Sequence, residues 1–315
     1  MLFRSDLERV TDTLISIGCS PNAAAVLIVS LGCEGTDHER MVKEISATGK
    51  HVEIIHIQEL GGVSKAIQVG TDIARQLVIE VSGLQRQPVD ASNIVMSIKC
   101  GGSDTTSGMA SNCVIGYVAD KLVDLGATVI FGETTEFIGG EHLLARRGVN
   151  KEVGDKIFEI VNNMETRAKS LGCDMRKGQP TPGNIEGGLS SIEEKSLGAI
   201  MKSGTKPIQG VLEYPERVTN QKGLWIKDTP GREPEILTGM AATGAQCMMF
   251  STGRGAPQGF PSMPVIKICG NPNTYTRMEQ DMDINAGLIL TGDKTIEQVG
   301  EEAFARLLDT LSGKI

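Results

Sequence analysis

The chain has 315 residues, of which 40% are hydrophobic and 22% charged, so it can build a folded core and wholesale disorder is not expected. Its net charge is −8 and only 3% of its residues are aromatic, which argues against a nucleic-acid-binding protein. The longest apolar stretch, residues 23–33, is too short to cross a bilayer, and charges interrupt the region where a signal peptide would be apolar. Seven scattered cysteines do not resemble a disulfide framework, so we expect a cytoplasmic protein with reduced thiols.

Strand and helix signals alternate through the first half of the chain. Short apolar runs predict buried strands, and periodic segments predict helices between them. The expected strands span 26–32, 51–57, 93–102 and 127–133, and the expected helices span 36–49, 63–82, 107–126 and 150–172. This order is typical of a doubly wound parallel sheet, so we predict a flavodoxin-like or Rossmann-like α/β domain over residues 1–172.

The second half repeats the α/β pattern after a break. Residues 173–190 are rich in Gly, Pro and polar side chains, which indicates a domain boundary or an active-site loop. A short helix over 191–204 is followed by expected strands at 208–214, 223–229, 247–252 and 264–270, and by an amphipathic helix over 295–313. We therefore predict a second α/β domain over residues 173–315, which contains the TGRG and DMDINAG motifs.

Three glycine-rich loops, residues 31–36, 99–108 and 132–136, each follow a predicted strand. Ligands of doubly wound sheets bind at the carboxyl ends of the strands, so we expect a site at this rim. Ordinary strand-to-helix turns with Asp and Thr caps remain an alternative for each loop. The loop that contains Ser103 and Asp104 could bind an anion through its backbone N–H groups, but it lacks the Gly-Lys-Ser/Thr ending of a P-loop.

Candidate acid and base residues follow the fourth strand. Glu133, Glu136, Glu141 and His142 lie within ten residues and could supply an acid, a base and a metal ligand, or they could begin a solvated helix. Lys195 lies in a short charged run that by itself indicates a solvated helix face. No CxxC, HxxxH or HExxH spacing is present, so any metal site must be assembled from distant segments.

Arg254 stands between two glycines directly after a predicted strand. The glycines let the backbone approach a ligand, and a guanidinium is the natural bidentate partner of a carboxylate. Lys267 lies in the next strand. Asp281 and Asp283 follow at a spacing typical of either a turn or a divalent-metal loop.

These motifs together resemble the altronate/galactarate dehydratase family, which includes sulfolactate sulfo-lyase large subunits. The matching stretches are GCE (32–34), CGGSDTTSG (100–108), GETTEFIGGEHLLARR (132–147), TPGNIEGGLSSIEEKSLGAIMKSG (181–204), TGMAATGAQCMMFSTGRGAPQG (238–259), PVIKICGNPNTY (264–275) and DMDINAG (281–287). They occur in order through most of the chain. Relative to the family pattern, the first domain is expected to be shortened at its N-terminus. The family's small domain is either fused or a separate subunit, so a shortened product, a fragment and one subunit of a complex are all alternatives for this chain.

The resemblance implies a metal-dependent hydro-lyase that removes water across C2–C3 of a sugar acid and yields a 2-keto-3-deoxy acid. A divalent metal, Fe²⁺ or Mn²⁺, would bind the substrate carboxylate and a hydroxyl and stabilise the enediolate. The resemblance implies candidate residues for each role. They are Glu133, Glu136, His142 and Lys195 for catalysis, and Ser103, Asp104, Arg254, Lys267, Asp281 and Asp283 for substrate binding. Cys33 and Cys100, with Glu34 or Asp104, are the candidate metal ligands.

Two other functions fit the same motifs. A sulfo-lyase would expel sulfite from sulfolactate, because a few pocket contacts set the leaving group. A non-catalytic protein could bind a sugar acid or a nucleotide at the same rim. We expect a small-molecule ligand and a homo-oligomer, with no nucleic-acid or membrane partner.

Overall fold

The computed structural model describes residues 4–315 and divides them into two compact units. Unit 1 takes in the described residues up to Val89, together with Pro215–Val218 and Ala241–Gly244. Unit 2 takes in Asp90–Tyr214, Thr219–Met240 and Ala245–Ile315. Across residues 4–315, no helix has both the length and the apolar composition that a membrane span requires.

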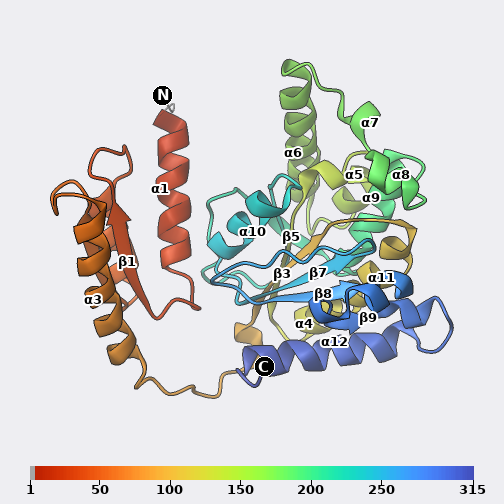
Figure 1. Cartoon of the computed structure of the whole chain (residues 1–315). Helices are drawn as coiled ribbons and strands as arrows, with labels where there is room; N and C mark the ends of the chain where they lie inside the picture. The colour runs from red at the N-terminus through yellow and green to blue at the C-terminus, as the bar shows by residue number, and fades with distance from the viewer. Residues whose placement is uncertain (1–3) are drawn as a thin grey trace. The chain divides into compact units, whose positions relative to one another are not determined.

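Unit 1 is built on a pair of parallel strands, which are drawn in red and orange in Figure 1. Its elements are α1 (Arg4–Gly18), β1 (Ala25–Ser30), α2 (His38–Ser46), β2 (His51–His56) and α3 (Val63–Val81). Ile15, Ile28, Met41 and Ile45 form its buried core. As expected for an N-cap, the Asp37 carboxylate accepts a hydrogen bond from the Arg40 N–H at the start of α2.

Unit 2 contains a seven-stranded sheet in which every pair of neighbouring strands is parallel. The strands lie in the order β5-β6-β4-β3-β7-β8-β9. They are β3 (Val95–Cys100), β4 (Thr128–Phe131), β5 (Ile208–Leu212), β6 (Gly223–Lys227), β7 (Cys247–Thr252), β8 (Val265–Cys269) and β9 (Ile284–Asn285). The α/β class predicted from the alternating pattern is thereby confirmed.

Helices cover both faces of this sheet. Figure 1 shows α4 (Asn112–Asp124) and α12 (Ile296–Leu311) along one face, and α10 (Glu233–Ala242) on the other. The remaining helical elements are η1 (Ala91–Asn93), η2 (Ser107–Ser111), η3 (Thr134–Glu136), α5 (Glu141–Ala145), α6 (Lys151–Ser170), α7 (Met175–Gly178), α8 (Pro182–Glu186), α9 (Ile192–Ile200), η4 (Met201–Ser203), α11 (Pro272–Arg277), η5 (Glu279–Asp281) and η6 (Ala286–Ile289). Because both faces are covered, the strands are mostly apolar, and β4 and β7 are buried at every position.

The strand order reverses at β3. The chain first builds the sheet from β3 toward β4, β6 and β5, and then returns to add β7, β8 and β9 on the other side. In open parallel sheets, ligands bind beside the carboxyl ends of the strands at such a reversal. The topology therefore predicts a ligand site among the loops that follow β3, β4 and β7.

The structure divides the strands differently from the boundary predicted at residue 172. The strands β1 and β2 form their own sheet in unit 1, whereas β3 and β4 join the strands of the second half in unit 2. Strand pairing is a long-range choice, so consecutive βα repeats do not reveal which strands share a sheet. The segment 173–190 lies inside unit 2 and carries the short helices α7 and α8.

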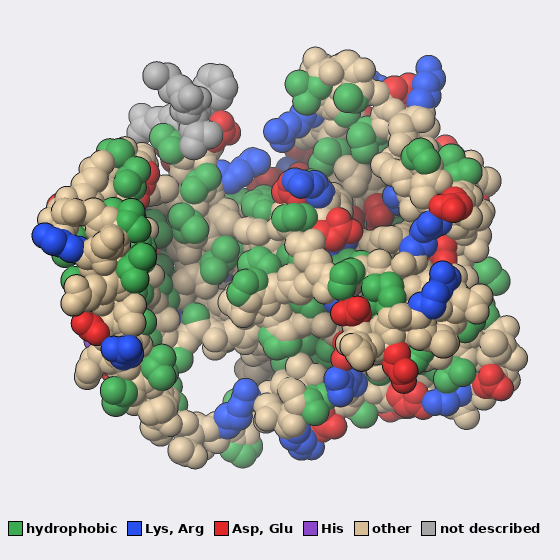
Figure 2. Space-filling view, viewed as in Figure 1, with side chains coloured by type: hydrophobic (Ala, Val, Ile, Leu, Met, Phe, Trp, Pro, Cys, Tyr) green, Lys and Arg blue, Asp and Glu red, His purple; other side chains and the backbone are tan. Residues whose placement is uncertain are grey.

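Figure 2 shows one face of unit 2 with its charged side chains. On the face drawn in Figure 2, basic and acidic side chains of this unit are interspersed rather than gathered by sign. This face therefore shows no basic patch of the kind that binds nucleic-acid phosphates.

Candidate active site

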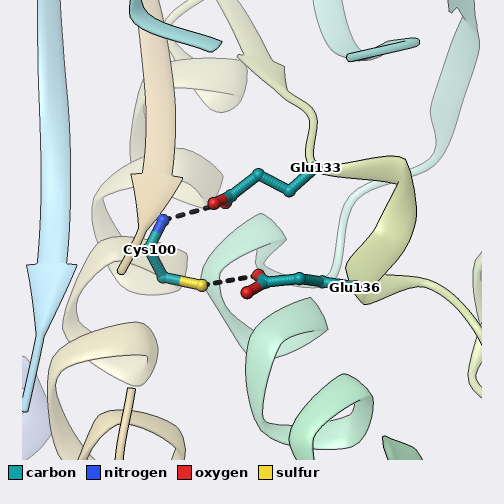
Figure 3. A group of neighbouring side chains, drawn as sticks. All are labelled: Cys100, Glu133 and Glu136. Atoms are coloured by element: carbon teal, nitrogen blue, oxygen red, sulfur yellow. Dashed lines mark hydrogen bonds between the residues drawn. The ribbon is translucent and has the colours of Figure 1, made fainter. Parts of the chain in front are cut away.

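A buried cluster lies at the carboxyl ends of β3 and β4. Cys100 is the last residue of β3, and Glu133 and Glu136 follow the neighbouring strand β4. The Cys100 N–H donates to Glu133 Oε2 over 2.9 Å, and the Cys100 thiol donates to Glu136 Oε2 over 2.8 Å, as drawn in Figure 3. All three side chains are buried. The parallel pairing of the two strands therefore brings together residues that are more than thirty positions apart in sequence.

The backbone at Glu133 is left-handed, with φ 70°, and this residue is the only non-glycine with positive φ among residues 4–315. Such a conformation is strained for a side chain with a Cβ, and strain of this kind gathers at functional sites. Its N–H donates to Thr229 Oγ1 over 2.9 Å, which holds the turn. The turn aims the Glu133 carboxylate back toward Cys100.

Two buried lysines complete the cluster. Lys99, from β3, places its Nζ 3.2 Å from Glu133 Oε1 and 3.4 Å from Glu233 Oε1. Lys202, from η4, forms an ion pair with Glu133 and lies 3.1 Å from Glu136 Oε2 and 3.1 Å from Cys100 Sγ. The side chains of both lysines are fully buried, so each must be paired to be tolerated.

Burial and neighbouring charges determine the protonation states of Cys100, Lys202 and Glu136. Burial raises the pKa of the Cys100 thiol well above its usual value, and Glu133 and Glu136 raise it further. Burial opposes the charge on Lys202, but Cys100, Glu133 and Glu136 nevertheless raise the pKa of this lysine well above its usual value. Burial likewise opposes the charge on Glu136, but Lys202 and Lys195 lower its pKa to about 2. At neutral pH the glutamate is therefore ionised, the lysine is charged and the thiol keeps its proton.

A cavity of about 650 Å³ opens beside this cluster, and Cys100 and Glu136 form part of its wall. Its volume lies within the range of sites for small molecules. Segments after four different strands supply polar groups to it, as expected for a rim site. Its polar and charged lining residues are Cys100, Ser103, Thr135, Glu136, Gln179, Thr181, Asn184, Lys195, Ser196, Arg232, Glu233 and Arg254.

Lys195 and Glu136 face each other in this wall. Lys195 lies on α9, which begins at Ser191 because the Ser191 hydroxyl accepts the Glu194 N–H. Its Nζ lies 3.8 Å from Glu136 Oε1 and donates to Gln179 Oε1 at 2.8 Å and to Asn184 Oδ1 at 3.2 Å. The lysine read from sequence as part of a solvated helix face is thus 14% exposed and oriented by three partners.

Arg254 reaches the same cavity from the loop after β7. Its Nη1 donates to the Gly183 carbonyl at 2.9 Å, and its Nη2 donates to Glu186 Oε2 at 2.8 Å. The preceding residue must be small, because a Cβ at Gly253 would lie 1.8 Å from Asp104 Oδ1. The guanidinium is 39% exposed, so it can turn toward a bound carboxylate without leaving a buried charge behind.

Several other sequence candidates hold loops together. Asp104 Oδ1 accepts the Thr106 hydroxyl at 2.5 Å and the Ser107 N–H at 3.1 Å, which forms the turn before η2. Asp283 accepts the Lys267 N–H at 2.8 Å and an N–H of Arg306 at 2.7 Å. These aspartates do not line the 650 Å³ cavity.

Lys267, Asp281 and His142 also lie outside the cavity wall. Lys267 Nζ donates to the backbone carbonyls of Ala256, at 2.7 Å, and of Gln258, and lies 4.1 Å from the centre of the Phe250 ring. Asp281 is exposed in η5, and His142 is exposed on α5. Of the catalytic candidates, the structure gathers Glu133, Glu136 and Lys195.

Cys33 and Glu34 belong to unit 1, in the turn after β1. Glu34 accepts the N–H groups of Leu31 and Gly32 at 2.9 and 2.7 Å and lies 3.2 Å from His38 Nε2. Its own backbone N–H and the Ser30 hydroxyl are the main causes that lower the pKa of Glu34 to about 2. Cys33 is exposed.

Within residues 4–315, Cys100, Glu133 and Glu136 are the group whose ligand atoms converge closely enough for a metal ion. Their chemistry as arranged does not fit a divalent ion. The Lys202 ammonium already contacts all three ligand atoms, the thiol keeps its proton and two lysines balance the two carboxylates. A divalent ion added to this neutral, buried group would bring two uncompensated positive charges.

Sequence reasoning did not single out Lys99, Lys202 or Glu233. A lone lysine is usually exposed, and neither lysine matches a catalytic motif. One signal was present: Lys99 interrupts an apolar strand, where a charge is tolerated only beside an opposite charge. Gln179 and Asn184 lie in the segment 173–190, for which an active-site loop was one of the two predictions.

The polar cavity of this parallel α/β unit contains a carboxylate, an ammonium and a guanidinium. These groups are typical of an enzyme that catalyses proton transfer on a small carboxylic acid. Comparison with known proteins identifies the family. Residues 91–315 match the model of the D-galactarate/altronate dehydratase C-terminal domain, and residues 1–82 match the second domain of D-galactarate dehydratase/altronate hydrolase. The chain belongs to the galactarate/altronate dehydratase family, and the resemblance noted in the sequence is confirmed.

The individual relatives are named as sugar-acid dehydratases or as a sulfo-lyase subunit. The chain is 40% identical to the (2R)-sulfolactate sulfo-lyase subunit beta of Chromohalobacter salexigens, over 99% of this chain and 80% of the relative. It is 37% identical to the galactarate dehydratase (L-threo-forming) of Escherichia coli, over 96% of this chain and 59% of the relative. It is 32% identical to the altronate dehydratase of Bacillus subtilis, over 98% of this chain and 61% of the relative. The chain thus spans about three fifths of the length of these two dehydratases.

Proposed function

We propose that this protein is a hydro-lyase that removes water from a sugar acid of the galactarate and altronate class and forms a 2-keto-3-deoxy acid. The observation that carries the proposal is the pair of Glu136 and Lys195, 3.8 Å apart in the wall of a polar cavity that Arg254 also lines. Elimination needs a base and an acid within reach of adjacent carbons, and this pair offers both.

The proposed reaction begins when Arg254 binds the substrate carboxylate and fixes C2 near Glu136. Glu136 takes the C2 proton, and the electrons of the C2–H bond form the C2=C3 double bond. The C3–O bond breaks, and Lys195 gives its proton to the departing hydroxyl, which leaves as water. The enol that remains becomes the 2-keto-3-deoxy acid by moving its hydroxyl proton to C3.

Substrate binding itself would make Glu136 a better base. Lys195 is one of the charges that lower the pKa of Glu136 to about 2. A hydroxylated substrate that draws the Lys195 ammonium to its own oxygen weakens that interaction. The pKa of Glu136 would then rise toward its ordinary range, in which a carboxylate accepts a proton more readily.

Elimination of sulfite from sulfolactate is the second candidate. It is favoured by the sulfo-lyase subunit, which is 40% identical and of which the chain covers 80%. The same base and the same carboxylate contact would serve, and the C–S bond to the sulfonate group would break to release sulfite in place of water. Because that relative is named a subunit beta, we also propose a separate small subunit as a partner of this chain.

The direct test is turnover by the purified protein, with and without a candidate small subunit, on altronate, galactarate and sulfolactate, scored as 2-keto acid or sulfite. We expect Glu136→Gln and Lys195→Met each to lower kcat by about 10²–10⁴-fold, because each removes one proton-transfer group. Glu193→Gln, at an exposed carboxylate on the same helix, and Lys151→Met, at an exposed lysine, serve as controls.

The outcomes separate the candidates. Keto acid that depends on Glu136 and Lys195 supports the hydro-lyase, and sulfite release moves the assignment to the sulfo-lyase. Full turnover by either variant would remove that residue from the chemistry. Binding of a sugar acid without turnover, with the small subunit present, would favour a non-catalytic binding protein.

A divalent metal, Fe²⁺ or Mn²⁺, is the cofactor that the sequence resemblance implies, whereas the proposed proton transfers use the chain's own side chains. Any such ion would need ligands other than the Cys100, Glu133 and Glu136 group as it is arranged. Cys33 and Glu34 remain proposed ligands. Metal analysis of the purified protein before and after chelation, together with the Cys33→Ser variant, tests this proposal: loss of bound metal in that variant supports it, and unchanged content contradicts it.

A further inference from the structure

The position of the Lys202 ammonium among three metal-type ligand atoms has a consequence beyond the reaction itself. Cys100, Glu133 and Glu136 each direct one ligand atom to a common point, and these atoms lie within 4.8 Å of one another. Lys202 Nζ lies 3.1 Å from Cys100 Sγ and 3.1 Å from Glu136 Oε2, and it pairs with Glu133. An ammonium has three N–H groups, and here it has three partners.

We propose that Lys202 is the resident cation of this cluster: its ammonium takes the position that a divalent metal would need, and it positions Glu136 at the cavity wall. Lys202 is thus a positioning residue that touches no substrate. The proposal deepens the proposed function, because it says what holds the base in place. It rests on that function only for the role of Glu136.

Geometry supports a fixed cation better than an exchangeable one. Lys202 and Glu133 are both 0% exposed, so neither side chain is in contact with bulk water. A metal would bring its ligand atoms to about 2.0–2.3 Å, and the ammonium sits at hydrogen-bond distance from two of them instead. The segment that carries Lys202 is also held by its neighbours, since the Ser203 hydroxyl donates to the Ile200 carbonyl and accepts from Arg147.

Charge supports the same conclusion. Two buried glutamates face two buried lysines, so the cluster is already balanced. Lys99 offers a matched comparison, because it is equally buried and pairs with Glu133 but does not contact the Cys100 sulfur or Glu136. Removal of either lysine unbalances the cluster, but only removal of Lys202 vacates the point shared by the three ligand atoms.

Cobalt(II) absorption tests the proposal, because cobalt bound to a thiolate gives an intense charge-transfer band. We expect the wild-type protein and Cys100→Ser to give the same band intensity with added Co²⁺, since Cys100 is not a ligand while Lys202 is present. We expect Lys202→Met to gain a band equivalent to one thiolate, and the double variant Lys202→Met/Cys100→Ser to lose it. Lys99→Met should gain none.

Each result decides the matter. A wild-type band that Cys100→Ser abolishes would overturn the proposal, and this comparison needs no Lys202 variant, so it stands even where Lys202→Met fails to fold. Cys100→Ser retains a hydroxyl that can donate to Glu136 and should fold. A folded Lys202→Met without a new band, or a band of equal size in Lys99→Met, would also overturn it.

A melting experiment and kinetics separate positioning from simple support of the fold. Mn²⁺ should raise the melting temperature of Lys202→Met but not that of the wild-type protein or the double variant, because a ligand stabilises only a state that binds it. With an active enzyme, Lys202→Met should lower kcat more than tenfold with KM changed less than threefold, whereas equal activity would contradict the positioning role. The cobalt readout needs no substrate, so failure of the lyase assay and failure of this proposal are distinguishable.

Discussion

Arg254 contacts a neighbouring loop and is proposed to bind the substrate carboxylate. In the structure its guanidinium divides its N–H groups between the Gly183 carbonyl and Glu186, at the edge of the cavity. An exposed ion pair of this kind contributes little to stability, about 0–1 kcal/mol. A substitution at Arg254 should therefore affect the proposed carboxylate contact more than the stability of the fold.

Arg254→Lys should consequently lower kcat/KM by about 10–100-fold, since a lysine cannot replace two parallel N–H contacts and each lost tenfold corresponds to about 1.4 kcal/mol. The unfolding midpoint should stay near that of the wild-type protein. Steady-state kinetics and urea unfolding measure the two effects, with the exposed Arg75→Lys as control. Unchanged kcat/KM would place the substrate carboxylate elsewhere.

Lys267 is expected to make the stability of the folded protein depend on pH in the alkaline range. Burial and the nearby charge of Lys99 lower the pKa of Lys267 to about 8, whereas the unfolded chain keeps a value of about 10.4. Between these values the unfolded state binds more protons than the folded state, so stability rises with pH across this window, relative to a variant without the group.

The difference in unfolding free energy between the wild-type protein and Lys267→Met should therefore shift in favour of the wild-type protein from about pH 8 to about pH 10.4. Urea titrations at matched pH values measure it, and other lysines cancel in the difference. A difference that stays flat with pH would contradict the lowered pKa.

At the residue scale, the sequence indicated part of the candidate site. Glu136, Lys195 and Arg254 were candidates because acid, base and carboxylate-binding groups are recognisable types, and all three line one cavity. Lys99 and Lys202 were missed because a buried lysine becomes visible only when its partners are known, and those partners are up to 134 positions away in sequence. Pairing across such separations is decided by the fold.

Helices and strands were predicted from the sequence more completely than the site residues. Each strand expected after residue 20 is present, and β2, β7 and β8 begin or end within two residues of the apolar runs that predicted them. Apolar runs of this length have few alternatives in a covered parallel sheet, so local composition suffices. The η2 turn within the expected helix 107–126 was not foreseen, because a π-helical turn leaves no local pattern.

The contact between α4 and η4 is the element-scale feature on which the cluster depends. A Cβ at Gly116 of α4 would lie 2.4 Å from the Met201 carbonyl oxygen and 3.2 Å from Gly204 Cα. Backbone atoms on both sides leave little room to adjust. Since Met201 begins η4, any movement of η4 away from α4 also displaces Lys202.

Gly116→Ala should therefore destabilise the protein: overpacking costs about 1–3 kcal/mol, which exceeds the gain in helix propensity of up to ~1 kcal/mol. Activity should fall together with stability, because Lys202 moves. Thermal unfolding and kinetics measure both, with Gly259→Ala, which meets open space, as control. A stabilised, fully active Gly116→Ala would contradict this account of the contact.

At the scale of the whole molecule, the sequence indicated the α/β class but not the division of the strands. The repeating βα pattern of residues 26–133 is continuous, yet its first two strands belong to unit 1 and its next two to unit 2. Side-chain patterning specifies that a strand is buried, not which neighbour it pairs with. The family matches to residues 1–82 and 91–315 follow the same division.

The central position of β3 has a consequence for how the protein is made. Residues 97 and 247 become neighbours in the sheet although they are 150 positions apart, so β3 leaves the ribosome long before β7 exists. At about 5–20 residues per second, this delay is on the order of ten to thirty seconds. Throughout it, the edge of β3 that β7 will cover offers unpaired backbone groups and apolar side chains to any passing strand or chaperone.

Nascent chains arrested before β7 has emerged should therefore be cut rapidly by a protease within residues 90–214, and chains arrested after β8 has emerged should resist. Comparing the two lengths on purified ribosomes measures the difference, and equal resistance would mean that β3 and β4 fold without β7. A sheet that adds its second half to a strand made early depends on the cell to protect that strand until translation is nearly complete.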